Sequence, residues 1–233
     1  MKKLIISLVV LSALFVSGCS SKSKSADTEK STTTSTEETT TTTTAVPSTS
    51  CGEPLLDATK SYSVVFNTSK GSFTVALDVK NAPTSTAHLA ALVQAGFYTN
   101  LTFHRVVPDF VIQGGDPNGN GTGSSQCSVI SEEPPRPYKQ GDFAWAKGGN
   151  DPAGKAGSQF FIITGGANSD DVAALNQKAL QSDGSSKIQY GYAGSVTSGL
   201  NVALAIEALA PATVGGGTPT QKATITSAEL IQN

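Results

Sequence analysis

The sequence contains few of the residues on which metal centres and acid–base catalysis depend. Its 233 residues include only two histidines, His88 and His104, and no H-E-x-x-H pair. A zinc site or a histidine-dependent triad therefore has little support, because both need imidazole groups at defined spacing. We expect no metal and no cofactor, and we expect His104, which precedes Arg105, to be a hydrogen-bonded structural residue. The chemistry of this chain must need neither a metal ion nor a nucleophile.

An excess of basic residues is also absent, and internal repeats are not evident. Lys and Arg number 16 against 18 Asp and Glu, which gives a net charge of −2. This balance argues against nucleic acid as a partner, because phosphate binding needs a cationic surface. The region after residue 50, about 180 residues long, is large enough for one domain with a sizeable core, and we expect it to be a monomer.

The apolar run at the N-terminus is too short to cross a bilayer, which takes about 20 residues. It covers Leu4 to Val16, follows Lys2 and Lys3, and suits the core of a signal peptide. The V-S-G-C sequence at 16–19 resembles a bacterial lipobox, which implies cleavage after residue 18 and lipidation of Cys19. We therefore predict a signal peptide at 1–18 and an exported protein, lipid-anchored at the extracytoplasmic face of a bacterial membrane. A plain secretory signal is the alternative.

Aromatic residues are missing from Ser20 to Ser50, where 20 of 31 residues are Ser or Thr. Such a segment cannot bury enough apolar area to offset its ordering entropy of ~1–2 kcal/mol per residue, so we predict a disordered tether at 19–50. A flexible chain of this length spans roughly 30 Å on average. An O-glycosylated stalk is an alternative that the threonine run 39–44 permits.

Three cysteines occur in the chain, and lipidation of Cys19 leaves Cys51 and Cys127. Two cysteines in an exported protein favour a disulfide, because oxidising compartments form such bonds. Closing a loop of this length would stabilise the fold by about 4 kcal/mol in the chain-entropy model. Two separate buried thiols are the alternative.

Hydrophobic periodicity from Ser61 onward predicts strands before helices. Two strands are expected at Ser63–Asn67 and Ser72–Val79, because in the second of them apolar and polar residues alternate, and the T-S-K-G sequence between them suits a hairpin turn. Helical spacing follows Pro83 and stops at Gly96, and it returns from Gly199 to Leu209. The pattern favours a β-rich closed sheet capped by helices.

The densest motif begins at Tyr98 and reads Y-T-N-L-T-F-H-R-V-V-P-D-F-V-I-Q-G-G. Its apolar residues suit two short strands joined at Pro108, and Arg105 and Gln113 are the polar exceptions. A second motif, G-S-Q-F-F-I at 157–162, lies in a stretch that ends in a strand expected at Phe160–Ile163. Together the two motifs resemble the cyclophilin family of peptidyl-prolyl cis/trans isomerases. The resemblance covers roughly residues 61–209.

This resemblance implies a mainly β fold for residues 51–233, a closed eight-stranded antiparallel barrel with an α-helix closing each end. It also implies rotation about X-Pro bonds, a reaction that makes and breaks no covalent bond and whose barrier of ~20 kcal/mol comes from amide resonance. Arg105 would be the fixed cationic donor to the prolyl nitrogen, and Gln113 would hold it in place. Substrate-binding positions matched to the family are Phe110, Val111, Gly121, Ala146, Lys147, Gln159, Phe161 and Tyr190.

Two classes of function remain open for such a cleft. An active isomerase would speed folding of exported proteins, and its partners would be unfolded or extended polypeptides that contain proline. A binding module of the same fold would capture proline segments without useful turnover, as a holdase or surface adhesin. An intact Arg105 favours the isomerase.

The chain departs from the family pattern between about 165 and 192. Tyr190 stands where the family has His or Tyr, and the leucine of this segment corresponds to either Leu175 or Ile188.

The glycine-rich sequence that follows the densest motif indicates no ligand site. The D-P-N-G-N-G sequence at 116–121 begins like a calcium loop, but position twelve is Cys127 instead of Glu, and its glycines suit a tight turn.

The lipobox interpretation predicts the behaviour of a Cys19→Ala variant. This variant should be released from the membrane or remain an uncleaved precursor. The acyl chains that Cys19 would carry hold the protein by burying methylenes, at ~0.8 kcal/mol each, and alanine cannot carry them. The fraction of each protein in the detergent phase, measured on lysates of cells that express the parent or the variant, tests this. Equal partitioning of both proteins would contradict the prediction.

Overall fold

The computed structural model describes residues 49–178 and 190–233. The predicted signal peptide, Cys19, nearly all of the predicted tether and Ile188 lie outside the described residues. The described residues belong to one compact unit. Within the described part of the chain, no helix is long and apolar enough to cross a membrane.

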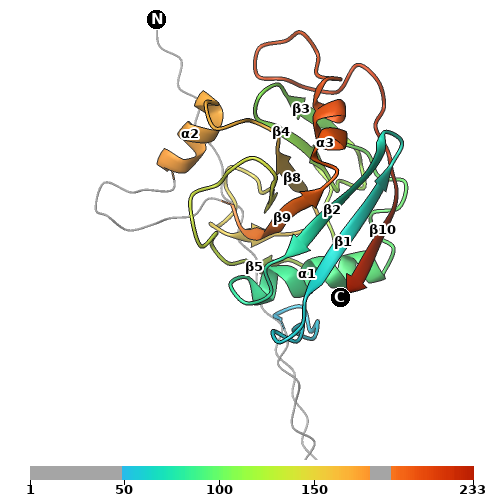
Figure 1. Ribbon diagram of the computed structural model, residues 1–233, viewed down its shortest axis with the longest axis vertical. Helices are drawn as coiled ribbons and strands as arrows, with labels where there is room; N and C mark the ends of the chain where they lie inside the picture. Colours follow the sequence, from blue (N-terminus) through green and yellow to red (C-terminus); the bar gives the residue numbers. More distant parts are fainter. Residues whose placement is uncertain (1–48, 179–189) are drawn as a thin grey trace, which may run out of the picture. The chain divides into compact units, whose positions relative to one another are not determined.

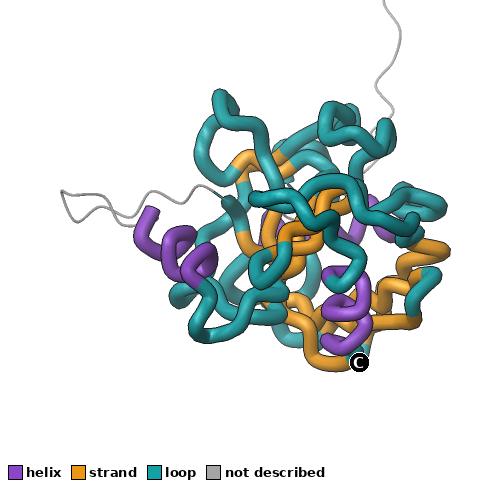
Figure 2. Tube along the Cα trace, turned by 90° about the horizontal axis from the view of Figure 1, so that it is seen from above, coloured by secondary structure: helices purple, strands orange, loops and turns teal. Residues whose placement is uncertain are grey.

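An antiparallel sheet of eight strands forms the body of the fold (Figure 1). The strand order is β10-β1-β2-β9-β6-β8-β4-β3. Viewed from above, these strands curve around the core and loops cover much of this end (Figure 2). A separate two-stranded ladder joins β5 and β7. The strands are β1 (Tyr62–Thr68), β2 (Gly71–Leu77), β3 (Arg105–Val107), β4 (Val111–Gly114), β5 (Val129–Ile130), β6 (Asp142–Trp145), β7 (Lys155–Ala156), β8 (Phe160–Ile163), β9 (Tyr192–Ser198) and β10 (Ile225–Gln232).

The expectation of a closed barrel is wrong, because the sheet is a curled half-barrel whose edge strands are β10 and β3. Between the two edges, the described residues contain only isolated bridges, Thr102–Thr224 and Val106–Gly217. β3 is three residues long and is followed by Pro108, which has no amide hydrogen to continue a ladder. On its other side β3 meets the loop before β10, where Val106 and Gly217 exchange two backbone hydrogen bonds, so no ladder joins β3 to β10.

The concave side of the sheet holds an aromatic core. Phe143 and Phe160 stack with ring centroids 4.7 Å apart, and Phe66 lies 5.3 Å from Phe160. The predicted hairpin is present as β1 and β2, and alternate residues of β2 such as Phe73 and Val75 are buried in this core. Alternation in the sequence therefore identified the buried face correctly.

Two helices occupy opposite ends of the sheet, as the sequence predicts (Figure 1). α1 (Pro83–Gln94) packs against β5, β9 and β10, and α3 (Leu200–Glu207) packs against β2, β3 and β4. Gly96, with φ +67°, adopts the left-handed conformation that ends α1.

A third helix, α2 (Asp170–Lys178), was not expected, so the prediction of two helices is wrong. Its start is marked in the sequence. Ser169 Oγ accepts the amide hydrogen of Val172 at 3.3 Å, and Asp170 and Asp171 lie in the first turn, where negative charge favours a helix. Val172 and Leu175 of this helix join a second apolar cluster on the convex side of the sheet, with Val107, Val111, Tyr138, Ala144, Phe161 and Ile163.

The predicted disulfide between Cys51 and Cys127 is present, with a Cα–Cα distance of 6.1 Å.

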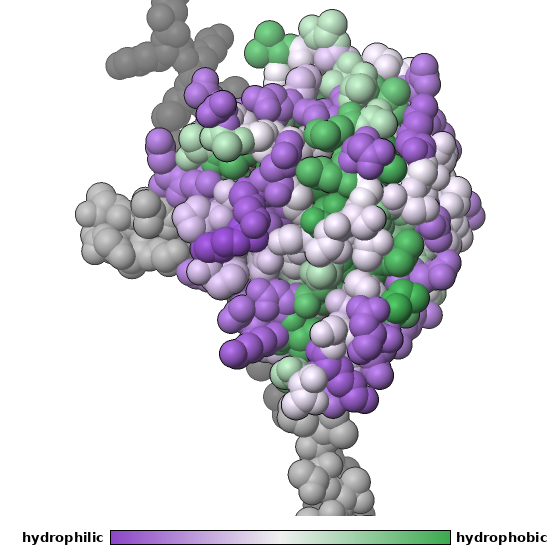
Figure 3. All heavy atoms as spheres, in the orientation of Figure 1, coloured by the Kyte–Doolittle hydropathy of each residue, from purple (hydrophilic) through white to green (hydrophobic). Residues whose placement is uncertain are grey.

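The surface in the orientation of Figure 1 is mixed, with apolar residues in a band that polar residues interrupt (Figure 3). Large apolar side chains exposed among the described residues are Ile130, Leu204, Val214 and Ile231.

The N-terminus of α1 is capped by a distant carboxylate. Its N-cap residue, Ala82, has no side chain able to accept a hydrogen bond. Instead Glu132 accepts the amide hydrogens of Thr84 at 2.7 Å and Ser85 at 2.9 Å. These are two of the amides that a helix leaves without internal partners, and the negative charge also favours this end of the helix dipole.

Replacement of Glu132 by Ala should therefore lower the free energy of unfolding by about 1–2 kcal/mol, in the range of a lost helix cap. The free energy of unfolding of Glu132→Gln should lie between those of the Ala variant and the parent, because the amide oxygen can still accept one hydrogen bond but carries no charge. Urea denaturation of the three proteins measures this order. An Ala variant as stable as the parent would show that solvent satisfies these amides equally well.

Candidate active site

Strand register places the predicted site residues in one row across the sheet. Arg105 on β3 pairs with Gln113 on β4, and Gln113 pairs with Phe161 on β8. Phe161 in turn pairs with Ala144 on β6. Directly paired residues point to the same side of a sheet, and neighbouring strands lie about 4.8 Å apart. The row therefore presents a cation, an amide and an aromatic ring side by side on the convex face.

Hydrogen bonds connect the polar members of this row. Arg105 Nη1 donates to Oε1 of Gln113 at 3.3 Å, and Gln113 Nε2 donates to Oε1 of Gln159 at 3.0 Å. Gln159 Nε2 then donates to the carbonyl oxygens of Gly121 and Gly123, at 3.0 Å and 2.7 Å. Each amide accepts on one side and donates on the other. The orientation of the guanidinium group is thus linked to the loop at 121–123.

Asp116 organises that loop. Its buried carboxylate accepts the amide hydrogens of Asn118, Asn120 and Gly121. Burial by itself would raise the pKa of Asp116, but these three amides outweigh it and hold the pKa below its ordinary value of 3.8. Gly121 has φ +88°, which glycine adopts without strain. The sequence that begins like a calcium loop is therefore a turn built around one carboxylate.

A small cavity of about 140 Å³ opens above the row. The rings of Phe161 and Tyr190 meet edge to face, with centroids 5.3 Å apart, and the ammonium group of Lys147 lies 5.9 Å from the Tyr190 ring. The Tyr138 hydroxyl donates to the carbonyl oxygen of Tyr190 and fixes the backbone there. The cavity is lined by Arg105, Phe110, Val111, Gln113, Ala146, Lys147, Phe161 and Tyr190. These are eight of the ten residues predicted for the site.

A larger cavity of about 320 Å³ adjoins the first and shares Gln113, Ala146 and Lys147 with it. Gly121 and Gln159, the other two predicted residues, line this second cavity. Its wall is mainly polar and includes a pair that the sequence did not indicate, Lys155 with Asp151, whose charged atoms lie 2.8 Å apart. All ten predicted residues therefore lie in two connected hollows.

His104 differs from the expectation. The residue is buried, but neither ring nitrogen has a hydrogen-bond partner among the described residues. Burial lowers its pKa below the ordinary value of 6.5, despite the opposing effect of the Asp116 carboxylate, and Arg105 lowers it further. A neutral imidazole beside Arg105 leaves the guanidinium as the main charge at this edge of the row.

The described residues contain one group of histidine, cysteine and carboxylate side chains close enough to hold a metal ion, and it lies outside both cavities. It consists of Cys51, Glu53 and His88. None of these three residues lines either cavity. The smaller cavity offers Arg105 and Lys147 as cations, the Gln113 amide, and an apolar wall.

Residues 63–230 match the sequence profile of the family described as cyclophilin type peptidyl-prolyl cis-trans isomerase/CLD. The chain belongs to the cyclophilin family. A crystal structure of the cyclophilin type peptidyl-prolyl cis-trans isomerase of Cryptosporidium parvum aligns with 74% of this chain and 99% of its own, at 25% identity and a TM-score of 0.59. A second crystal structure of that protein, in the presence of the dipeptide ala-pro, aligns at 24% identity with a TM-score of 0.59, over 73% of this chain and 99% of its own. The curled sheet is thus a cyclophilin fold.

Curated cyclophilin relatives align over shorter stretches. Peptidyl-prolyl cis-trans isomerase-like 1 of Aspergillus fumigatus is 49% identical over 70 residues, 30% of this chain and 42% of that protein. The peptidyl-prolyl cis-trans isomerase of Helicobacter pylori J99 is 36% identical over 108 residues, 46% of this chain and 65% of that protein. Peptidyl-prolyl cis-trans isomerase B of Bacillus subtilis is 43% identical over 84 residues, 35% of this chain and 57% of that protein. The chain thus spans less than two thirds of each.

The hydrogen-bond series in this cyclophilin predicts the effect of Gln159→Leu. Loss of the amide should free the carbonyl groups of Gly121 and Gly123 and leave Gln113 with one partner fewer, because leucine has similar size but no polar atoms. Hydrogen–deuterium exchange at 118–124 should become at least threefold faster, while exchange in β1 and β2 stays unchanged. Unaltered exchange at 118–124 would show that Asp116 alone holds the loop.

Proposed function

We propose that this cyclophilin is a peptidyl-prolyl cis/trans isomerase that acts, as a monomer, on unfolded or extended polypeptides containing proline. One observation carries the proposal. A guanidinium group, oriented by Gln113, lies at the rim of a small cavity whose other walls include Phe110, Val111 and Phe161. The names of the curated relatives and the Ala-Pro structure of the Cryptosporidium parvum protein support the same substrate chemistry.

The reaction is a rotation, so the site has only to favour the twisted amide over both planar forms. Rotation removes the amide resonance that gives a barrier of ~20 kcal/mol, and the lone pair of the prolyl nitrogen, delocalised in the planar amide, becomes localised on nitrogen as the nitrogen becomes pyramidal. An N–H of Arg105 directed at this nitrogen would interact more strongly with the twisted state than with either planar state. The apolar wall would hold the proline ring and exclude water, which strengthens that interaction.

Gln113 contributes to the same step without contacting the reacting nitrogen. Its Oε1 takes one Arg105 donor and leaves the others available to substrate, and the link through Gln159 fixes the amide. A fixed donor needs no reorganisation when the amide twists, which is the general advantage of a preorganised polar site. The larger adjoining cavity would accept residues that flank the proline, since the two hollows share the wall at 146–147.

We also propose that the protein works outside the cytoplasm, held at a bacterial membrane through lipid on Cys19. The V-S-G-C sequence after an apolar run supports this location. The Cys51–Cys127 disulfide is consistent with it, because oxidising compartments maintain such bonds. Its clients would be other exported chains whose folding waits on proline isomerisation.

Arg105→Ala should lower kcat/KM for a proline peptide by roughly 10²–10³-fold, the range for losing one electrostatic donor of about 3–4 kcal/mol. Binding of the planar peptide should change much less, because the apolar wall remains. Arg105→Lys should recover only part of the rate, since lysine keeps the charge but lacks the planar fork. A protease-coupled or magnetisation-exchange isomerisation assay measures these values, with folding checked by circular dichroism.

Phe161→Ala is the matched variant on the apolar side of the cavity. It removes wall that both planar and twisted states contact, so peptide binding and turnover should fall together. An Arg105→Ala protein that isomerises within about threefold of the parent would contradict the mechanism. A parent protein that binds the peptide without accelerating isomerisation would select the alternative, a non-catalytic module that captures proline segments as a holdase or surface adhesin.

A further inference from the structure

The side chain of His88 on α1 contacts the Glu53 carboxylate, and this contact needs a proton or a metal ion between the two groups. The His88 side chain is 1% exposed, and its Nε2 lies 2.8 Å from the carbonyl oxygen of Gly157, so Nε2 carries a hydrogen. Its Nδ1 lies 2.7 Å from Oε1 of Glu53. A carboxylate oxygen and an unprotonated ring nitrogen both present lone pairs, which repel each other at this distance. A proton or a metal ion must therefore lie between them.

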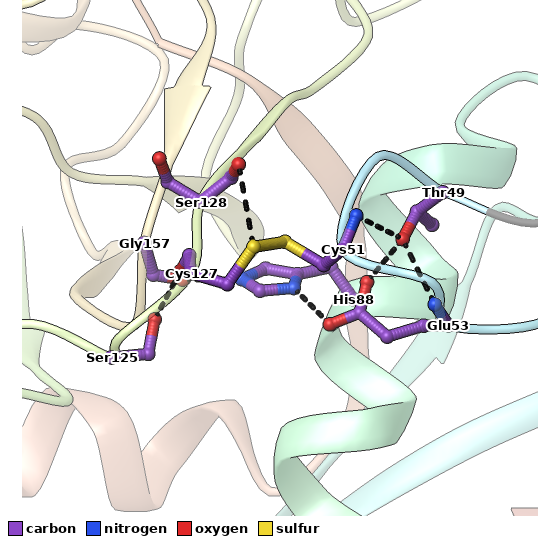
Figure 4. Close-up of a disulfide and its surroundings, with 8 residues drawn as sticks. All are labelled: Thr49, Cys51, Glu53, His88, Ser125, Cys127, Ser128 and Gly157. Atoms are coloured by element: carbon purple, nitrogen blue, oxygen red, sulfur yellow. Dashed lines mark hydrogen bonds and ion pairs between the residues drawn. A yellow bond between two sulfur atoms is a disulfide. The ribbon is translucent and has the colours of Figure 1, made fainter. Parts of the chain in front are cut away.

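The disulfide lies directly beside this pair (Figure 4). The ligand atoms of Cys51, Glu53 and His88 all lie within 4.8 Å of one another, and the sulfur of Cys127 is bonded to that of Cys51. Two sulfurs, one imidazole nitrogen and one carboxylate oxygen are the donors that Zn²⁺ takes in proteins. In a tetrahedral zinc site such donors are about 3.3–3.8 Å apart, given bonds of about 2.0–2.3 Å. The atoms of Cys51, Glu53 and His88 are within about 1.5 Å of that spacing, and reduction would let the two sulfurs move apart from their bonded distance of 2.02 Å.

The outer contacts of the group resemble those of a metal ligand set. A histidine bound to metal usually donates its other ring N–H to a carbonyl or carboxylate, and His88 Nε2 does so to Gly157. Glu53 Oε2 accepts a hydrogen bond from the Thr49 hydroxyl. Thr49 Oγ1 accepts the amide hydrogens of Cys51 and Glu53, at 3.2 Å and 3.3 Å. His88 and Glu53 are therefore oriented by contacts that do not involve the disulfide.

We propose that this group is a zinc site that becomes available when the disulfide is reduced. A phosphine or dithiol reductant supplies two electrons, the S–S bond breaks, and each sulfur takes up a proton. With a phosphine, one water molecule gives both protons and its oxygen forms the phosphine oxide; a dithiol gives its own two protons and becomes a disulfide. Zn²⁺ then binds the two thiolates, Nδ1 of His88 and the carboxylate of Glu53. The thiol protons and the hydrogen between His88 and Glu53 are released to solvent. Disulfide and zinc are alternative cross-links between the same two segments.

Each segment has another contact that holds it to the fold after reduction. On one side, Glu53 Oε1 lies 2.7 Å from Nδ1 of His88 on α1. On the other side, the Ser125 amide donates to Ser158 Oγ at 3.0 Å. The site also lies behind the larger cavity, because Gly157 both lines that cavity and accepts the hydrogen bond from His88. Either the disulfide or the zinc ion would therefore hold the Gly157 side of the larger cavity in place.

Metal titration of the full chain tests this proposal. Cys19→Ser provides the background, so that Cys51 and Cys127 are the only cysteines. After reduction with a phosphine, the protein should bind one equivalent of Co²⁺ with a thiolate-to-cobalt absorption band, and Zn²⁺ should displace it with submicromolar Kd. The oxidised protein should bind at least 100-fold more weakly. Added Zn²⁺ should raise the Tm of the reduced protein and leave that of the oxidised protein unchanged.

Substitutions separate the four ligands. His88→Gln and Glu53→Gln should each weaken metal binding at least tenfold in the reduced protein, and Cys51→Ser with Cys127→Ser should abolish the absorption band. His104→Gln, which alters the other histidine, is the matched control and should bind as the parent does. If reduction unfolds the protein, Zn²⁺ must restore its circular dichroism. Absence of the band, failure of this restoration, tight binding by the oxidised protein, or parental affinity in both Gln variants would overturn the proposal.

Discussion

The pairing of β4 with both β3 and β8 is the constraint on which this structure depends. It places Gln113 between Arg105 on one side and Phe161 on the other. Because side chains alternate along a strand, a shift of one residue in either ladder would send one partner into the aromatic core. The residues before and after Gln113 in β4, Ile112 and Gly114, are buried in the structure. The hydrophobic effect that fixes these ladders therefore also fixes the geometry of the site.

Both faces of this part of the sheet are apolar, and the site lies where the outer cover ends. The concave side is filled by stacked rings such as Phe143 and Phe160. On the convex side, Val172 and Leu175 of α2 belong to the cluster that contains Phe161. Toward Arg105 no such cover is present in the described part of the chain, and the cavity of about 140 Å³ takes its place. A partly covered apolar strip beside a fixed cation suits a substrate that is itself a small ring attached to polar backbone.

The sequence was sufficient to predict features that depend on local pattern. Alternation identified the β1–β2 hairpin, and helical spacing identified α1 and α3. The ten site residues expected from the family resemblance all line one of the two cavities, although other lining residues such as Asp151 and Lys155 were missed. Features that depend on distant contacts were missed. Glu132 caps α1 from 48 residues away, and nothing near Ala82 indicates it. Closure of the sheet also failed as a prediction, because the outer side of β3 meets Gly217 in the loop before β10 instead of β10 itself, a distant contact that no local pattern indicates.

Two other differences have separate causes. The capping signal at Ser169 was visible but lies in a segment that departs from the family pattern, so α2 was overlooked. His104 was expected to have a hydrogen-bond partner because buried imidazoles usually do, and among the described residues neither ring nitrogen has one. The His88 group escaped notice because His88 lies 35 residues after Glu53, and Cys127 lies 76 residues after Cys51.

The position of the disulfide has a mechanical consequence. Cys51 lies just before β1, and Cys127 lies three residues after Ser124, which forms part of the wall of the larger cavity. A pull on the chain before residue 49 therefore reaches the cavity wall through one covalent bond and the short segment 124–127. Without that bond the same load would pass along residues 52–61 into β1, which two ladders hold, one to β2 and one to β10. The disulfide therefore gives a force between the N-terminal end of the described chain and the cavity wall a route that does not run through the sheet.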